Sequence, residues 1–180
     1  PDDPMATGGH SSIAWPTDVL CAPGSRSPIV GYLMPRVTET ASVIDFFNPR
    51  TRLLRCPVFN YLYLHRTARG YVVGDINETN ILVKNTALVT LIDTDSFQVP
   101  DPRTGTLYRS TVGTPAYTPP ELQGATFSQV DRTANHDRFG LGVVIFQLLM
   151  EGTHPYAGAF QSAGDGPALE ERIRAGLFPY

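Results

Sequence analysis

The sequence has little of what marks secreted, metal-binding, membrane-spanning or nucleic-acid-binding proteins. Its two cysteines, Cys21 and Cys56, form no CxxC pair and follow no signal peptide, so a disulfide framework or a zinc site has little support. The four histidines share no metal-ligand spacing, and no stretch approaches the roughly 20 apolar residues of a membrane span. The net charge is −3 and no Lys/Arg run occurs, which argues against nucleic-acid binding through this segment. These absences predict a reducing, cytoplasmic setting.

The first third of the chain carries turn and helix signals. The 180 residues, 42% of them hydrophobic, suit one globular domain with a substantial core. Two apolar runs, 13–21 and 29–37, flank a turn-rich segment and predict a hairpin of two antiparallel strands. Residues 42–47 predict a helical turn stopped by Asn48-Pro49, and residues 57–69 predict a second helix.

The rest of the chain alternates short strands, loops and helices. Residues 71–99 predict three short strands with polar ends, and residues 98–118 predict a long polar loop. Residues 138–150 are apolar nearly all round, which predicts a helix buried in the centre of a helical lobe. Residues 167–175 predict a small, capped surface helix.

Carboxylates and one carboxamide follow one another in a fixed order: Asp75, Asn80 and Asp93, with Glu121 and Asp137 further on. The first two lie five residues apart in a loop just before a predicted strand, and the third follows the next strand. Phosphoryl transfer from ATP needs such a set, because its catalysis is mostly positioning plus charge neutralisation by Mg2+. Hard oxygen ligands suit Mg2+, and one further carboxylate can orient the attacking hydroxyl.

Five segments, in order, resemble the motifs of protein kinases. VGDINETN at 73–80 resembles the kinase catalytic loop, LIDTD at 91–95 the DFG segment, and GTPAYTPPE at 113–121 the segment that ends in APE. DRFGLGV at 137–143 resembles the start of the central buried helix, and GTHPY at 152–156 resembles the turn after it. The resemblance implies an α+β, protein-kinase-like fold.

The particular residues in these motifs resemble those of one divergent bacterial group of kinases. It comprises the kinase domains of helix-hairpin-helix kinase proteins, which are associated with tellurium-resistance-type phosphorylation triads. The resemblance implies that residues 1–37 are a remnant of the N-terminal β lobe, namely two strands and the hinge. Residues 38–180 would form the mainly helical C-terminal lobe. The triads imply a PP2C-type phosphatase and a von Willebrand A-domain protein as partners beside a protein substrate.

The resemblance also implies a role for each matching position in the catalytic centre. Asp75 would be the catalytic aspartate that orients the substrate hydroxyl, and Asn80 and Asp93 would be the Mg2+ ligands. Thr114 would contact the catalytic loop, as in Ser/Thr-directed kinases. Asn77 stands at the catalytic position where the family has a lysine that contacts the transferred phosphoryl group.

Further positions would bind the nucleotide or hold the lobe together. Met34 would be the gatekeeper, the Pro35 carbonyl would accept from the adenine amino group, and the Val37 backbone would donate to the ring. Leu82 would form the floor of the adenine pocket. The structural motif residues are Glu121 and Asp137, of which the second would cap backbone N–H groups of the catalytic loop.

The sequence departs from the family pattern around the catalytic loop. Val73-Gly74 replaces the usual His-Arg, so no arginine stands there to receive a phosphate from the activation loop. Asn77 removes a positive charge, which lowers the expected rate. Asp95 adds a carboxylate near Mg2+, either as a ligand or as a turn residue. Ser110 and Thr111 are candidate phosphorylation sites, and the alternative is an unmodified, solvent-exposed loop.

Parts of a complete kinase domain are absent from the sequence. No glycine-rich loop and no strand with the ATP-gripping lysine precede residue 13, so we expect truncation at both ends. The predicted helix at 57–69 spans about 20 Å where about 20 residues, about 30 Å, are needed, and we expect residues to be missing near 68–70. Activity of this fragment alone is not expected.

Three functions compete for this sequence. The leading hypothesis is a Ser/Thr protein kinase domain that transfers the γ-phosphate of ATP, with Mg2+, to protein hydroxyls in bacterial signalling. The first alternative is a pseudokinase that binds nucleotide or partners without catalysis, which Asn77 and Asp95 favour. The second is a small-molecule phosphotransferase of the aminoglycoside-kinase type, which shares the Gly-Asp-x4-Asn loop. Residues 113–121 argue against it, because such enzymes lack this protein-substrate platform.

Overall fold

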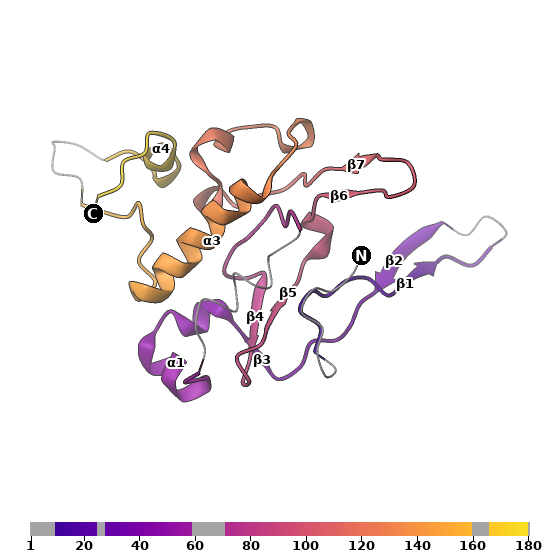
Figure 1. Ribbon diagram of the computed structural model, residues 1–180, viewed down its shortest axis with the longest axis horizontal. Helices are drawn as coiled ribbons and strands as arrows, with labels where there is room; N and C mark the ends of the chain where they lie inside the picture. The colour runs from indigo at the N-terminus through magenta and orange to yellow at the C-terminus, as the bar shows by residue number, and fades with distance from the viewer. Residues whose placement is uncertain (1–9, 25–27, 59–70, 160–165, 180) are drawn as a thin grey trace.

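Helices and antiparallel strands are interspersed along the chain (Figure 1). The computed structural model describes residues 10–24, 28–58, 71–159 and 166–179. In chain order the elements are β1 (Asp18–Cys21), β2 (Ile29–Leu33), β3 (Thr40–Ser42), the 3-10 turn η1 (Val43–Phe46), α1 (Pro49–Arg55), β4 (Ile81–Lys84), β5 (Val89–Leu91), η2 (Thr94–Ser96), β6 (Val99–Pro100), β7 (Leu107–Tyr108), η3 (Pro115–Tyr117), η4 (Pro120–Leu122), η5 (Phe127–Gln129), α3 (Ala134–Leu149) and α4 (Leu169–Arg174).

Strands β1 and β2 form the hairpin that the turn-rich segment predicted. They pair antiparallel, with Asp18 opposite Leu33 and Leu20 opposite Gly31, and the register shifts between Leu20 and Cys21. Figure 1 shows the hairpin projecting away from the sheet and from α3. Its side chains are largely exposed, Val30 among them. Backbone hydrogen bonds between β1 and β2 therefore hold the hairpin together, and β2 leads directly into the segment 34–37.

A second antiparallel sheet has the order β3-β4-β5 and carries the core residues that precede the candidate site. Ile81 lies opposite Leu91, and Val83 lies opposite Val89, so these four side chains share one face. All four are buried. Residues 12–14 extend the sheet, because the Leu91 carbonyl accepts from Ala14 N (2.9 Å) and Leu91 N donates to the Ser12 carbonyl (2.8 Å). This arrangement fixes the end of β5, from which Asp93 emerges.

Helix α1 corrects one sequence prediction. The helical turn over 42–47 is confirmed by η1, but Asn48-Pro49 does not end helical structure there. Instead α1 begins at Pro49, and the Asn48 side chain accepts from Arg50 N (2.9 Å). Asn at the N-cap followed by Pro in the first turn is a start signal, because it satisfies free N–H groups and presets the backbone. The helix predicted over 57–69 and the gap predicted near 68–70 lie almost wholly outside the described residues.

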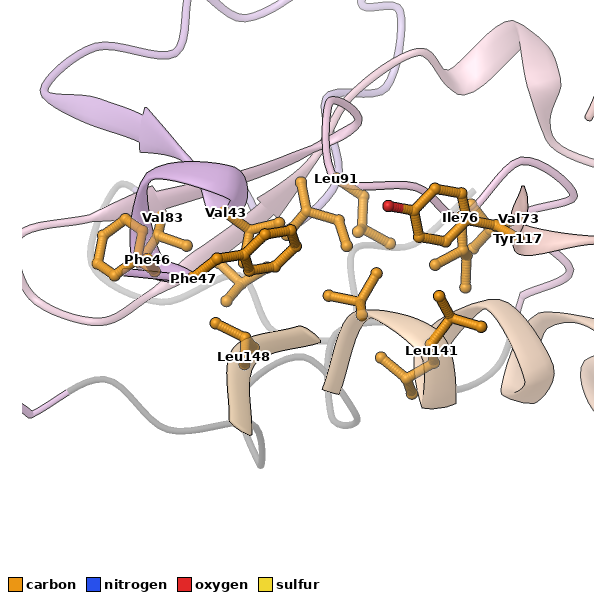
Figure 2. Packing of buried hydrophobic residues seen from close by; sticks show 14 of the residues in the cluster. Val43, Phe46, Phe47, Val73, Ile76, Val83, Leu91, Tyr117, Leu141 and Leu148 are labelled. Carbon is orange, nitrogen blue, oxygen red and sulfur yellow. The ribbon is translucent and has the colours of Figure 1, made fainter. Parts of the chain in front are cut away.

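Helix α3 packs against the sheet and η1 to form the core. Figure 2 shows Leu148 of α3 beside Val43 and Phe47, and Leu141 of the same helix beside Ile76 and Tyr117. All six residues belong to one buried cluster. The helix begins at Ala134, four residues before its predicted start, because Thr133 N donates to His136 Nδ1 (3.1 Å) at its first turn. In the part of the chain that the structure describes, α3 buries one face and not its whole circumference, since Leu149 is 65% exposed.

The remaining segments are close to their sequence predictions, with one difference. The helix predicted over 167–175 is confirmed by α4, whose Ile173 is buried. The long loop over 98–118 is more structured than expected, because β6 and β7 pair antiparallel within it, with Val99 opposite Tyr108. Among the described residues, no helix combines the length and apolar character needed to cross a membrane.

Candidate active site

The loop 73–80 is tied down by the first turns of α3. Asp137 Oδ2 accepts from Val73 N (2.7 Å) and its Oδ1 accepts from Gly74 N (2.9 Å). Burial raises the pKa of Asp137, while these two backbone hydrogen bonds and the charges of Arg132 and His136 act in the opposite direction. The carboxylate satisfies two N–H groups that would otherwise be buried without a partner. The structure thus places Asp137 behind the loop, as a support for it.

Asp75 connects the loop to a segment far along the chain. Its Oδ1 accepts from Thr114 N (2.8 Å), across 39 residues of sequence. Its backbone carbonyl accepts from Asn80 Nδ2 (3.1 Å), which closes the loop on itself. One carboxylate oxygen is therefore held by the 113–121 segment, and this contact aligns Asp75 and Thr114 as a unit.

Asn77, expected at a catalytic position, lies buried within the loop. Its side chain is 4% exposed. Oδ1 accepts from Thr79 N (2.9 Å) and Asn80 N (3.2 Å), and Nδ2 donates to the Asp75 carbonyl (3.4 Å) and Thr114 Oγ1 (3.3 Å). Both polar atoms of the carboxamide thus have partners within the loop or on Thr114, so Asn77 helps to order the loop, and its catalytic role stays a prediction.

Asp93 and Asn80 meet beside the end of β5. Asn80 Nδ2 lies 3.4 Å from Asp93 Oδ2. Asp93 has a φ of 62°, in the left-handed region that Asp tolerates better than most residues. Its pKa is raised by partial burial first, then by the hydrogen bond and charge of Asp95 and by the charge of Asp75, while Asn80 lowers it. The carboxylates of Asp75, Asp93 and Asp95 are thus close enough for their charges to affect one another.

The donor set at this place fits Mg2+. Asn80 and Asp93 supply hard oxygen atoms, and a divalent cation would relieve the repulsion that raises the pKa of Asp93. In the described ranges, no group of three or more His, Cys, Asp or Glu side chains is arranged to hold a metal ion. Such a site suits an ion that one or two protein ligands share with substrate phosphates and water, which is the usual coordination of Mg2+.

A cavity of about 480 Å3 lies between the hinge residues and these oxygen ligands. Its volume is in the range of small-molecule sites. Five of the predicted site residues line it, and they come from segments far apart in the sequence: Met34, Pro35, Val37, Asn80 and Asp93. The structure therefore brings the expected nucleotide contacts and the expected metal ligands to one cavity.

Four further residues line the cavity: Ala14, Tyr32, Ile92 and Asp95. From the sequence, Asp95 was expected near Mg2+, and the other three residues were given no role. Ile92 could have been found by its place directly before Asp93. Leu82, expected as the floor of the pocket, is not among the lining residues. It stands in β4 opposite Ser42 and Thr90, and this register determines which way its side chain lies.

The loop before Gly113 is less exposed than the sequence suggested. Ser110 was expected in a solvent-exposed loop, but it is fully buried. It packs against Gly74, where any side chain would collide with Ser110 Oγ and approach the Ser96 carbonyl. A phosphate on Ser110 would therefore require this segment to leave its place. Thr111 is exposed, and its modification stays a prediction.

Glu121 has a partner in α3, though a weak one. Its Oε1 lies 3.8 Å from His136 Nε2, and the Glu121 side chain is exposed. An exposed ion pair of this kind contributes little to stability. The neighbouring residue Tyr117 is better anchored, because its hydroxyl donates to Gln147 Oε1 (2.9 Å) in the middle of α3. Tyr117 therefore holds the 113–121 segment to the core more firmly than Glu121 does.

Comparison with known proteins supports a kinase-like family for this chain. It is 36% identical over 181 residues to a protein of Escherichia coli O157:H7 named protein kinase YegI, and 35% identical over 181 residues to protein kinase YegI of Escherichia coli strain K12. Each alignment covers 93% of this chain, which spans only 28% of the length of each of these relatives. No protein-family model matches the chain.

Proposed function

We propose that this chain has a protein-kinase-like fold and is part of a Ser/Thr protein kinase domain that uses ATP and Mg2+ in bacterial signalling. The observation that carries the proposal is the cavity shared by the hinge residues 34–37 and the oxygen ligands Asn80 and Asp93. A nucleotide needs both ends of such a cavity, an apolar hinge for its base and a cation site for its phosphates. The relatives named protein kinase support the same reaction.

Asp75 would act on the hydroxyl of the protein substrate. Its Oδ1 accepts from Thr114 N, and its second carboxylate oxygen would accept the proton of a serine or threonine hydroxyl. The hydroxyl oxygen forms the new bond to the γ-phosphorus, the bond from that phosphorus to the β,γ-bridging oxygen breaks, and ADP leaves. Proton acceptance by a positioned carboxylate contributes typically 10²–10⁴-fold to such a step.

The other residues of the cavity would bind and orient the nucleotide. Asn80 and Asp93 would hold Mg2+, which, when bound, supplies neutralisation of the phosphate charge. The Pro35 carbonyl would accept from the adenine amino group, a task that requires no N–H from proline. Met34 and Val37 line the same end of the cavity. Thr114 N donates to Asp75 Oδ1, so the segment 113–121 would hold Asp75 in place beside a protein substrate.

The test is transfer of labelled γ-phosphate by the natural full-length protein. We expect phosphoserine or phosphothreonine in the product, with a loss of about 10²-fold or more in Asp75→Asn and in Asp93→Asn. Asp45→Asn is the matched control, because Asp45 lies on η1, outside the cavity lining, and forms a long ion pair with Arg55 (3.9 Å). Equal transfer by Asp75→Asn and Asp45→Asn would contradict the proposal.

A pseudokinase is the second candidate, and the inward-facing Asn77 favours it. The buried carboxamide leaves no cation at the position where the family has a lysine. A protein that binds nucleotide with normal affinity but transfers no phosphate in the assay above would have this function. Labelling of a small alcohol or amine in place of protein would instead indicate a small-molecule phosphotransferase.

A further inference from the structure

Arg132 is a buried guanidinium that touches both halves of the candidate site. It lies between η5 and α3 and is 5% exposed. Its Nη1 donates to the Gly74 carbonyl and its Nη2 donates to the Val112 carbonyl. The guanidinium carbon stands 4.1 Å from the centre of the Phe127 ring, at the distance of a cation–π contact. One side chain therefore bridges the catalytic loop and the segment 110–118.

The backbone of Arg132 is held by hydrogen bonds, as its guanidinium group is. Arg132 N donates to Gln98 Oε1 (2.8 Å), and Gln98 Nε2 donates to the Arg132 carbonyl (2.8 Å). Gln98 is itself held by its own N–H, which donates to the Val72 carbonyl (2.9 Å) at the start of the loop. The side chain of Arg132 thus reaches Gly74 from a backbone position that Gln98 fixes on both sides.

Two glycines make room for this bridge. A side chain at Gly113 would place its Cβ 2.9 Å from Arg132 Nη2 and 2.9 Å from the Phe127 ring. Gly74 has a φ of +83° and leaves space for Ser110 against its α-carbon. The same Gly74 removes the arginine that kinases of the resembled family carry before the catalytic aspartate. The structure supplies a guanidinium at this place from a residue 58 positions away.

The charge of Arg132 is balanced by the catalytic loop and by α3. Burial lowers the pKa of the guanidinium, and the charges of Asp137 and Asp75 act against that shift. Removing a buried charge that has hydrogen-bond partners on two segments strongly destabilises the fold, because the partner groups are left buried without a donor. The cation therefore holds Gly74 and Val112 together, and these residues flank the Asp75–Thr114 contact.

We propose that Arg132 is a positioning residue that fastens segment 110–118 onto the catalytic loop without any phosphate. The inference rests on the proposed kinase function for its effect on rate. In a kinase regulated at this segment, a phosphate would pair with an arginine of the catalytic loop to order the segment. Here two backbone carbonyls take the place of the phosphate, so the segment is ordered as soon as the chain folds. Phosphorylation of Thr111 is then unnecessary for activity.

The test compares Arg132→Met and Arg132→Lys with the control Arg109→Met in the natural full-length protein. Arg109 is an exposed arginine of the same region, and its guanidinium pairs with Asp131 (2.6 Å). We measure kcat, the KM for ATP, and amide hydrogen exchange of residues 110–118. We expect kcat to fall about 10²-fold in Arg132→Met with KM for ATP within about twofold, since the effect is misplacement of Asp75. Arg132→Lys should recover only part of kcat, because an ammonium lacks the fork that spans two carbonyls.

Exchange of residues 110–118 should become faster in both Arg132 variants and stay unchanged in Arg109→Met. Wild-type protein treated with phosphatase, and Thr111→Ala, should keep full kcat. Unchanged kcat and exchange in Arg132→Met would overturn the inference, as would loss of ATP binding together with activity, or loss of activity on phosphatase treatment. If the wild-type protein transfers no phosphate, the proposed function fails, and the exchange comparison still decides whether Arg132 holds the segment.

Discussion

Replacing Asp137 by asparagine tests how this side chain supports the loop 73–80. The wild-type carboxylate accepts from Val73 N (2.7 Å) and Gly74 N (2.9 Å). An asparagine presents one oxygen and one amide nitrogen, so it can accept only one of these bonds, and its NH2 group must face the other N–H. The change therefore keeps the shape of the side chain and removes one acceptor.

The size of the effect follows from these two hydrogen bonds. A hydrogen bond to a charged group is worth roughly 1.5–3 kcal/mol, and a neutral one about 1 kcal/mol. Losing one charged bond and weakening the other gives a loss of about 2–4 kcal/mol. Part of this is offset, because burial raises the pKa of Asp137 and the asparagine has no charge to bury. We expect the loop to lose about 2 kcal/mol, which corresponds to roughly 30-fold more frequent opening.

Amide hydrogen exchange followed by mass spectrometry measures this opening within the natural protein. Peptides that cover residues 71–76 should exchange about 30-fold faster in Asp137→Asn than in the wild type. Asp131→Asn is the control, because Asp131 is an exposed carboxylate six residues earlier whose partner is Arg109. Exchange in Asp137→Asn that stays within twofold of the control would refute the reasoning about the loop.

Three further predictions concern the residues around this loop. Gly74→Ala should cost about 1–3 kcal/mol in a denaturant titration, because its methyl group would collide with Ser110 and its φ is positive; an unchanged midpoint would argue that Ser110 is not packed there. Asn77→Lys should lower kcat and not restore it, since the buried carboxamide orders the loop through four neighbours; a higher kcat would show that Asn77 faces the phosphoryl group. Burial lowers the pKa of His154 below 6.5, so its folded pKa lies under its unfolded one. The stability that neutral His154 contributes is then fully present above pH 6.5 and is lost as the pH falls through the folded pKa. Between about pH 7 and pH 5, the Tm of His154→Gln should therefore fall less than the Tm of the wild type.

Elements defined by local signals were predicted well from the sequence. The β1–β2 hairpin follows from a turn-rich segment between two apolar runs, and α4 follows from acidic residues early, arginines late and a glycine after its end. Helix α1 was missed because Asn-Pro both stops a preceding turn and starts a following helix. Only the residues that pack on the segment determine which of these two effects applies.

The sequence by itself determined the order and spacing of the polar residues. Asp75, Asn80 and Asp93 stand at strand ends and loops, where backbone geometry is set within a few residues, so their proximity could be expected. Their number and order also sufficed to propose phosphoryl transfer. These features depend on short-range geometry, which a sequence encodes directly.

Only the tertiary structure decided which side chains face the cavity and which support it. Asn77 turned inward and Ser110 became buried, because each lies against partners that are distant in sequence, namely Thr114 and Gly74. Arg132 donates to the Gly74 carbonyl in the loop 73–80 across 58 residues of sequence. Contacts of this range depend on how α3 and the sheet pack, since no local pattern records the neighbour that a side chain will meet once the chain has folded.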